Sequence, residues 1–226
     1  MPKKPAPLFE PALFQFLRDL AAHNDRTWFA ANKQRYEDHV KAPFLRFIEA
    51  FGPKLHKISP RFVADPAPTG GSFFRIYRDT RFAADKSPYK TAASAHFTHV
   101  SAGEGHHVPG FYLHLAPEEV FAGFGIWRPD GPALGKIRQT IADDGAGWKR
   151  ATKGRTLDGE SLARAPRGFP AEHPLVEDLK RKDFITSARY DEKQACAADF
   201  LDRFARDCKQ ASPFMSFLTQ AVGCKF

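Results

Sequence analysis

The sequence has few cysteines and no long apolar run, and both absences limit what the protein can be. Its three cysteines, Cys196, Cys208 and Cys224, form no C-x-x-C pair and no even disulfide framework. Such sparse cysteine favours a reducing compartment, so we expect a cytoplasmic protein. No stretch approaches the roughly 18 apolar residues of a membrane-spanning helix, and no apolar run follows Lys3 and Lys4 as in a signal peptide. We therefore expect no membrane partner.

Common catalytic and nucleotide-binding motifs are also missing. The chain contains no G-x-x-x-x-G-K-[ST], no G-x-G-x-x-G after a predicted strand and no G-x-S-x-G. A P-loop, a Rossmann turn and an esterase elbow are therefore unsupported, and we predict no cofactor. Histidines do gather between residues 96 and 114, but without H-E-x-x-H or Cys/His ligand spacing, so we predict no metal site. The candidates were His96, His99, Glu104, His106, His107 and His114.

What the chain has in quantity is positive charge and phenylalanine. The 226 residues carry a net charge of +8, and 42% of them are hydrophobic, including 22 Phe. This composition predicts a folded protein with enough apolar surface for a continuous core. The positive charge favours anionic partners.

Apolar residues at helical spacing predict helices at both ends of the chain. The first predicted helix has an apolar stripe of Phe9, Leu13, Phe16, Leu17 and Leu20. A second is expected over 25–40, with Asn24 or Asp25 as its N-cap. The third follows Pro43, and its apolar stripe is Phe44, Phe47, Ile48, Phe51 and Leu55. Further helices are expected over 132–142, near 175–180 and over 191–209. In the last helix, Cys196, Phe200, Phe204 and Cys208 repeat every four residues, which predicts an amphipathic C-terminal helix.

Alternating or β-branched and aromatic segments predict strands over 73–78, 95–100, 111–115, 120–127 and 183–190. The short gap at "APEE" predicts antiparallel pairing of the third and fourth. Gly123 and Gly125 share a face with Phe121 and Trp127, which leaves room for another group to approach. Helices, then strands, then helices predict an α+β fold with a central, mostly antiparallel sheet. We expect one domain over 1–226, with 1–8 flexible.

The stretch "RIYRDTRFAADKSPYK", residues 75–90, combines cationic and aromatic side chains. Guanidinium groups match the geometry of carboxylate and phosphate, so this cluster predicts a site for a small phosphate- or carboxylate-bearing anion. The expected ligand-binding residues are Arg75, Arg78, Arg81, Lys86, Tyr89 and Lys90. Arg75 and Arg78 would face opposite sides of a regular strand, so the strand must end or bulge near Tyr77 or Arg78. If a reaction is catalysed, Asp79 and His114 are the candidate proton-transfer groups.

Two other interpretations remain open at this point. The basic stretch is interleaved with Phe73, Phe74, Tyr77, Phe82 and Tyr89, which suits nucleic-acid binding, although no nucleic-acid-binding module is recognisable. Alternatively, Asp79 and Asp85 pair with the arginines in a stabilising network, and the protein acts through an interaction surface. The residues do not predict an oligomeric state.

The cluster also resembles a family signature. Arg75, Arg78, Asp79, Arg81, Phe82, Asp85, Lys86 and Tyr89 match the pattern of a mostly bacterial family, domain of unknown function 2461. The stretches "NDRTWFAANKQRYE", "GFYLHLAPEEVFAGFGIWRP" and "APRGFPAEHPLVEDLKRKDF" are similar to other parts of that family, so the resemblance spans nearly the whole chain. After "SPYKT" the chain continues "AASAHF", where relatives more often carry a histidine. The resemblance implies no particular activity, but it implies that the cluster residues belong to one shared feature.

Overall fold

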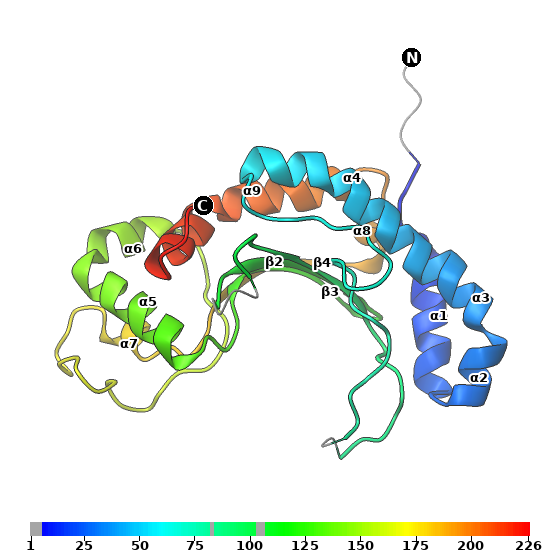
Figure 1. The fold of residues 1–226 in the computed structure, drawn as a ribbon, viewed down its shortest axis with the longest axis horizontal. Helices are drawn as coiled ribbons and strands as arrows, with labels where there is room; N and C mark the ends of the chain where they lie inside the picture. Colours follow the sequence, from blue (N-terminus) through cyan, green and yellow to red (C-terminus); the bar gives the residue numbers. More distant parts are fainter. Residues whose placement is uncertain (1–5, 82–83, 103–106) are drawn as a thin grey trace.

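The computed structural model describes residues 6–81, 84–102 and 107–226. Helices at both ends of the chain pack on one face of a central antiparallel sheet, which gives the predicted α+β fold (Figure 1). The N-terminal helices are α1 (Pro11–Ala22), α2 (Arg26–Ala31), α3 (Lys33–Tyr36), the π-helical turn η1 (Glu37–Lys41) and α4 (Ala42–Ile58). Three strands follow, β1 (Ala93–Thr98), β2 (Gly110–Ala116) and β3 (Glu119–Ile126). The rest of the chain forms α5 (Gly131–Asp143), α6 (Gly145–Ala151), α7 (Val176–Leu179), β4 (Phe184–Tyr190), α8 (Glu192–Ala195) and α9 (Phe200–Ala221).

The predicted N-terminal helices are confirmed, with identifiable starts. The Asp25 carboxylate accepts a hydrogen bond from the Trp28 amide at 2.8 Å and caps α2, as short acidic side chains do at helix N-termini. Pro43 lies in the first turn of α4, where a missing amide proton costs nothing. The predicted helix over 25–40 is divided into α2, α3 and η1. Among the described residues, no helix is long and apolar enough to cross a membrane.

The sheet has the order β1-β2-β3-β4 with every pair antiparallel. The hairpin predicted at "APEE" is confirmed, because Ala116 pairs with Glu119 across a two-residue turn. Side chains alternate between the two faces. One face packs under α4 and α9: the Phe97 ring lies 4.7 Å from that of Phe51 and 6.0 Å from that of Phe204.

Two hydrophobic clusters make up the core. The larger lies between the N-terminal helices, the sheet and the first half of α9, and the smaller gathers α5, α6 and α7 around the second half of α9. Phe204 belongs to the first cluster and Phe214 to the second, so α9 joins them. Leu8, within the predicted flexible segment, packs against the larger cluster; residues 1–5 of that segment lie outside the described residues.

The predicted strand over 73–78 was wrong. This segment makes two single bridges, Phe73 with Ala95 of β1 and Tyr77 with Tyr89, which precedes β1. The Arg78 amide donates to the Pro88 carbonyl at 2.9 Å, but Pro88 has no amide proton to return the bond. A regular ladder therefore cannot continue past Arg78. Between the two bridges the pairing register shifts by two residues, so the segment is extended but irregular. The strand predicted over 95–100 begins two residues earlier, at Ala93, and ends at Thr98.

The single helix predicted over 191–209 was also wrong. A capping box between Asp191 and Gln194 begins the short helix α8, the chain turns over 196–199, and α9 then runs to Ala221. Ala197 and Ala198 are good helix formers, so local propensity does not predict the turn. The amphipathic stripe itself is confirmed, because Phe200, Phe204 and Cys208 are all buried.

Candidate functional site

The second face of the sheet, the open face, carries polar, aromatic and glycine residues instead of a helix layer. The alternation that buries Phe111 and Leu113 turns Tyr112 and His114 to this face, where His114 is paired with Ser94 across β1 and β2. Two cavities lie on the open face, and Phe74 and Tyr112 line both. Figure 1 shows this face bordered by the loop that contains residues 72–92 and by the segment that precedes α7.

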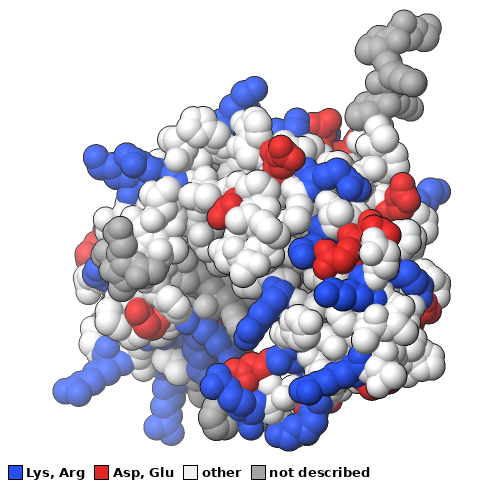
Figure 2. Space-filling model, turned by 45° about the vertical axis from the view of Figure 1, so that its right-hand side comes forward, with Lys and Arg blue, Asp and Glu red and all other residues white. Residues whose placement is uncertain are grey.

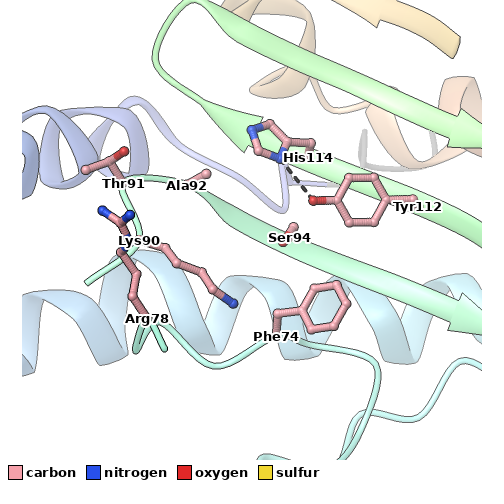
Figure 3. Close-up of a pocket in the computed structure, with 8 residues that line it drawn as sticks. All are labelled: Phe74, Arg78, Lys90, Thr91, Ala92, Ser94, Tyr112 and His114. Carbon is pink, nitrogen blue, oxygen red and sulfur yellow. Dashed lines mark hydrogen bonds between the residues drawn. The ribbon is translucent and has the colours of Figure 1, made fainter. Parts of the chain in front are cut away.

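The smaller cavity, the basic pocket, has a volume of about 410 Å³. Its lining residues are Phe74, Arg78, Lys90, Thr91, Ala92, Ser94, Tyr112 and His114. Figure 3 shows two sources for them: Arg78 and Lys90 come from segments beside the sheet edge, and Tyr112 and His114 come from β2. The pocket therefore brings cationic groups from outside the sheet against a polar sheet surface.

Lys90 holds its charge without a carboxylate partner. Its ammonium nitrogen lies 5.3 Å from the centre of the Phe74 ring, a cation–π contact. None of the described carboxylates lies within ion-pairing distance of Lys90: Asp79 pairs with Arg81, Asp85 with Arg78, and Glu119 lies closest to His114. Burial, and then the charge of Arg75, lower the pKa of Lys90 below its ordinary 10.5. Both causes act on the Lys90 ammonium group, whose positive charge is not neutralised by any of the described carboxylates.

Arg78 adds a second cationic group to the pocket wall. One of its terminal nitrogens, Nη1, forms an ion pair with Asp85, and in Figure 3 the guanidinium lies on the Thr91 side of the pocket. The hydroxyl of Ser87 is the main cause that lowers the pKa of Asp85, with the Arg78 ion pair contributing. The pair is partly exposed, so we expect it to contribute little to stability.

A chain of polar groups runs along the sheet side of the pocket. The Tyr112 hydroxyl and His114 Nδ1 are hydrogen bonded at 3.1 Å, and Ser94 lines the same side of the pocket. Glu119 Oε2 lies 3.9 Å from His114 Nε2, which favours the tautomer with its proton on Nε2. Burial lowers the pKa of His114 below 6.5, and Glu119 partly opposes it. His114 is thus held neutral at neutral pH, with Nδ1 accepting from Tyr112.

The other predicted ligand-binding residues do not line the basic pocket, so of the three predicted arginines Arg78 alone is among its lining residues. Arg81 is 76% exposed and binds Asp79 through two hydrogen bonds, of 3.0 and 2.6 Å. These contacts lower the pKa of Asp79 and make it a weak proton acceptor. Lys86 Nζ donates to the Thr80 carbonyl at 3.0 Å. Arg75 is exposed and lines neither cavity.

Tyr89 belongs to the core. It is 4% exposed and its ring stacks on that of Phe29 at 4.1 Å. Asn24 clamps its backbone, donating to the Tyr89 carbonyl and accepting from the Tyr89 amide, each at 3.0 Å. Tyr89 therefore fixes the neighbouring Lys90 in place, and we leave it out of the proposed site. Phe82 lies outside the described residues.

The larger cavity, the sheet cavity, has a volume of about 760 Å³ and lies over β2, β3 and β4. Its lining includes the aromatic residues Phe74, Tyr112, Phe121 and Trp127, and also Gly123 and Gly125, where the sequence indicated room for an approaching group. The face drawn in Figure 2 is hollowed near its middle, and Lys and Arg side chains border the hollow.

His96 lines the sheet cavity, with its ring stacked near that of Phe74, and two more of the predicted histidines have structural contacts. His99 is buried; its Nδ1 accepts from the Ser101 amide at 3.1 Å, so Nε2 donates to the Lys225 carbonyl at 2.8 Å. His107 Nδ1 accepts from the Asp130 amide at 2.9 Å. Within the described part of the chain, no three His, Cys, Asp or Glu side chains are grouped to hold a metal ion. Glu104 and His106 lie outside that part.

Of the residues that line the basic pocket, the sequence predicted Arg78, Lys90 and His114 as site residues, named Phe74 only in the nucleic-acid interpretation, and did not indicate Ser94 or Tyr112. The missed residues had a detectable signal. Tyr112 is two residues from His114 on a predicted strand, so both must face the same side. Predicting Ser94 as a pocket residue required the correct bounds of β1, and the predicted strand began two residues too late.

Comparison with known proteins gives one match. A family model described as "Conserved hypothetical protein (DUF2461)" matches residues 12–217. No curated protein and no solved structure matches the chain significantly.

Proposed function

The chain belongs to the DUF2461 family of conserved hypothetical proteins, and we propose that it binds a small phosphate- or carboxylate-bearing anion in the basic pocket. The observation that carries the proposal is Lys90, a partly buried ammonium group with no carboxylate partner among the described residues. A buried charge is costly unless it is paired. A bound anion would supply that pair.

The surroundings of Lys90 support the same ligand class. Arg78 contributes a guanidinium group, and the hydroxyls of Ser94 and Tyr112 and the His114 ring supply further hydrogen-bonding groups in the same cavity. Charge-assisted hydrogen bonds to phosphate or carboxylate are among the strongest in proteins. If the bound anion is a substrate, His114 is the group positioned to move a proton, since Asp79 lies in neither cavity.

A purely structural role for the cluster explains these contacts less well. The Arg78–Asp85 and Arg81–Asp79 pairs are solvent-accessible, and exposed ion pairs contribute little to stability. Among the described residues, Lys90 has no ion pair of the kind that a structural network would require. A structural role predicts a large fall in melting temperature for Arg78→Ala, whereas we expect a fall of only a few degrees.

The test is anion binding by Lys90→Met, with Lys136→Met as the matched control. Both substitutions remove one positive charge, but Lys136 lies exposed on α5, away from both cavities. A thermal-shift screen of phosphorylated and carboxylated metabolites would choose the probe, with inorganic phosphate and succinate as the simplest members. Calorimetry should then show that Lys90→Met weakens binding about tenfold to hundredfold, the effect of losing a charged hydrogen bond.

Equal affinity of the two variants would contradict the proposal, because binding would then depend on net charge alone. Loss of binding together with unfolding of Lys90→Met would favour the structural interpretation. The melting temperature of each variant separates these outcomes.

We also infer a reducing, cytoplasmic location. The support is that Cys196, Cys208 and Cys224 are all free thiols in the structure. Thiol titration of protein purified without reductant from its native cytoplasm should find three reactive groups after denaturation.

A further inference from the structure

Gly123 lies in the middle of β3 although neither packing nor backbone conformation requires a glycine there. A Cβ atom at this position would lie 3.6 Å from the Cβ atom of Tyr112 and 3.8 Å from the nearest atom of Phe121, both ordinary contact distances. Glycine weakens a strand interior because it loses more conformational freedom on folding and packs no side chain. The fold alone therefore does not explain Gly123.

Two neighbouring glycines provide the contrast. A Cβ at Gly110 would lie 2.0 Å from Nε2 of His96. At Gly125, φ is +124° and a Cβ would lie 2.0 Å from the Phe184 carbonyl oxygen. A side chain at Gly110 would force the His96 ring to move, and Gly125 needs glycine for its backbone, whereas Gly123 leaves bare backbone on the floor of the sheet cavity.

Aromatic side chains surround this bare backbone. Tyr112 is opposite Gly123 on β2, and Phe121 precedes it on the same face of β3. Phe74 and Trp127, which are 42% and 63% exposed, line the same cavity. Exposed aromatic groups gathered around a concavity commonly mark a ligand site. The rings of Tyr112 and Phe121 lie 5.8 Å apart, centre to centre, so a flat ligand ring would stack on these groups beside the strand position that has no side chain.

The sheet cavity is also continuous with the basic pocket. Phe74 and Tyr112 line both cavities, so the two cavities adjoin and a molecule that lies across these two side chains would contact both. On the far side of Gly123, Ser187 is its partner on β4 and donates to Asp158 at 2.8 Å. The surface formed by the two cavities is therefore apolar around Gly123, cationic toward Lys90 and hydrogen-bonding toward Ser187.

We propose that the ligand is an aromatic compound with an anionic group, whose ring lies on the bare backbone at Gly123 while its phosphate or carboxylate is held at Lys90. This inference rests on the proposed function for the identity of the anionic end. It adds the ring and its position, for which the support is independent. The sheet cavity, at about 760 Å³, has the size of pockets that hold small organic ligands.

The experiment compares 1-naphthyl phosphate with inorganic phosphate on the wild-type protein, Gly123→Leu and Gly123→Ala. The leucine side chain would occupy the floor of the sheet cavity, and the alanine methyl group would occupy little of it. The wild type should bind 1-naphthyl phosphate at least about tenfold more tightly than phosphate, from stacking and apolar burial. Gly123→Leu should lose this advantage and bind phosphate within about twofold of the wild type, since Gly123 lines only the sheet cavity and Lys90 and Arg78 line only the basic pocket. The melting temperature of Gly123→Leu should equal or exceed that of the wild type, because leucine suits a strand better than glycine does.

Each alternative result is informative. Phosphate binding without a Gly123-dependent advantage for the naphthyl compound overturns the ring site but leaves the proposed function intact. Gly123-dependent naphthyl binding with no phosphate binding retains the ring site and overturns the proposed anion site. Absence of both kinds of binding overturns both. Salt-sensitive binding of a single-stranded oligothymidylate, lost in Gly123→Leu, would instead assign the open face to nucleic acid.

Discussion

The two faces of the sheet are built from the same strands but have opposite chemistry. On β2, Phe111 and Leu113 are fully buried under the helices, whereas Tyr112 and His114 line cavities on the open face. On β3, Phe124 is buried on the covered face, whereas Gly123 has no side chain. Helices pack on the covered face, whereas the open face carries the two cavities and is the candidate ligand-binding surface.

Along each strand, residues that stabilise the core therefore alternate with residues that line the candidate site. Because successive side chains point to opposite faces, adjacent positions should respond differently to substitution. Experiments on adjacent residues can therefore break or sharpen the comparison.

The largest effect is expected on the covered face. Phe111→Ala should lower the free energy of unfolding by about 3–5 kcal/mol, because it leaves a cavity in the core. Its neighbour on the open face, Tyr112→Phe, removes only the hydroxyl group and should change stability much less, while it weakens anion binding. Urea unfolding and calorimetry measure the two quantities. Similar loss of stability in both variants would show that the faces are not separated.

An intermediate effect is expected from pH, with sulfate as a probe of constant charge. Sulfate affinity should fall as pH rises through the lowered pKa of Lys90, below 10.5, because the ammonium loses its charge. It should rise as pH falls below 6.5, because the neutral His114 gains a charge beside Arg78 and Lys90 and opposite Glu119. His114→Gln should abolish the acidic rise and keep the alkaline fall. A pH-independent affinity would mean that sulfate binds elsewhere.

The smallest effect is expected outside both faces. Arg81→Ala should leave the melting temperature and the anion affinity nearly unchanged, because Arg81 and Asp79 are exposed and line neither cavity. The matched variant is Arg78→Ala, in the basic pocket, which should weaken binding. A large loss of binding in Arg81→Ala would require a site that includes the loop beyond Asp79.

Much of the fold followed from periodicity in the sequence. The helical stripes around Phe16 and Phe47 and the hairpin at "APEE" carry local signals, and the structure confirms them. The prediction of a strand over 73–78 failed because the segment pairs with residues beyond the loop in two different registers and meets Pro88 at its end. The turn before Phe200 was not predicted because the residues around it do not disfavour a helix. Both errors concern contacts that a short window of sequence does not contain.

The candidate site was only partly predictable for the same reason. Composition identified Arg78 and Lys90 as cationic and His114 as titratable. Their proximity depends on the backbone clamp between Asn24 and Tyr89, across 65 residues of sequence. The sequence also could not show that Arg78 lines the pocket and Arg81 does not, since both are arginines of one signature.

The irregular segment 72–78 also protects the sheet from other chains. An edge strand with unpaired backbone groups can accept a strand from another molecule and begin aggregation. Here the Phe74 amide donates to the Ser94 carbonyl at 3.0 Å, and the His96 amide donates to the Ser72 carbonyl at 2.8 Å. The outer edge of β1 is thereby occupied without a fifth regular strand that would expose a new edge in turn. The same feature that defeated strand prediction thus favours a protein that stays dispersed at high concentration.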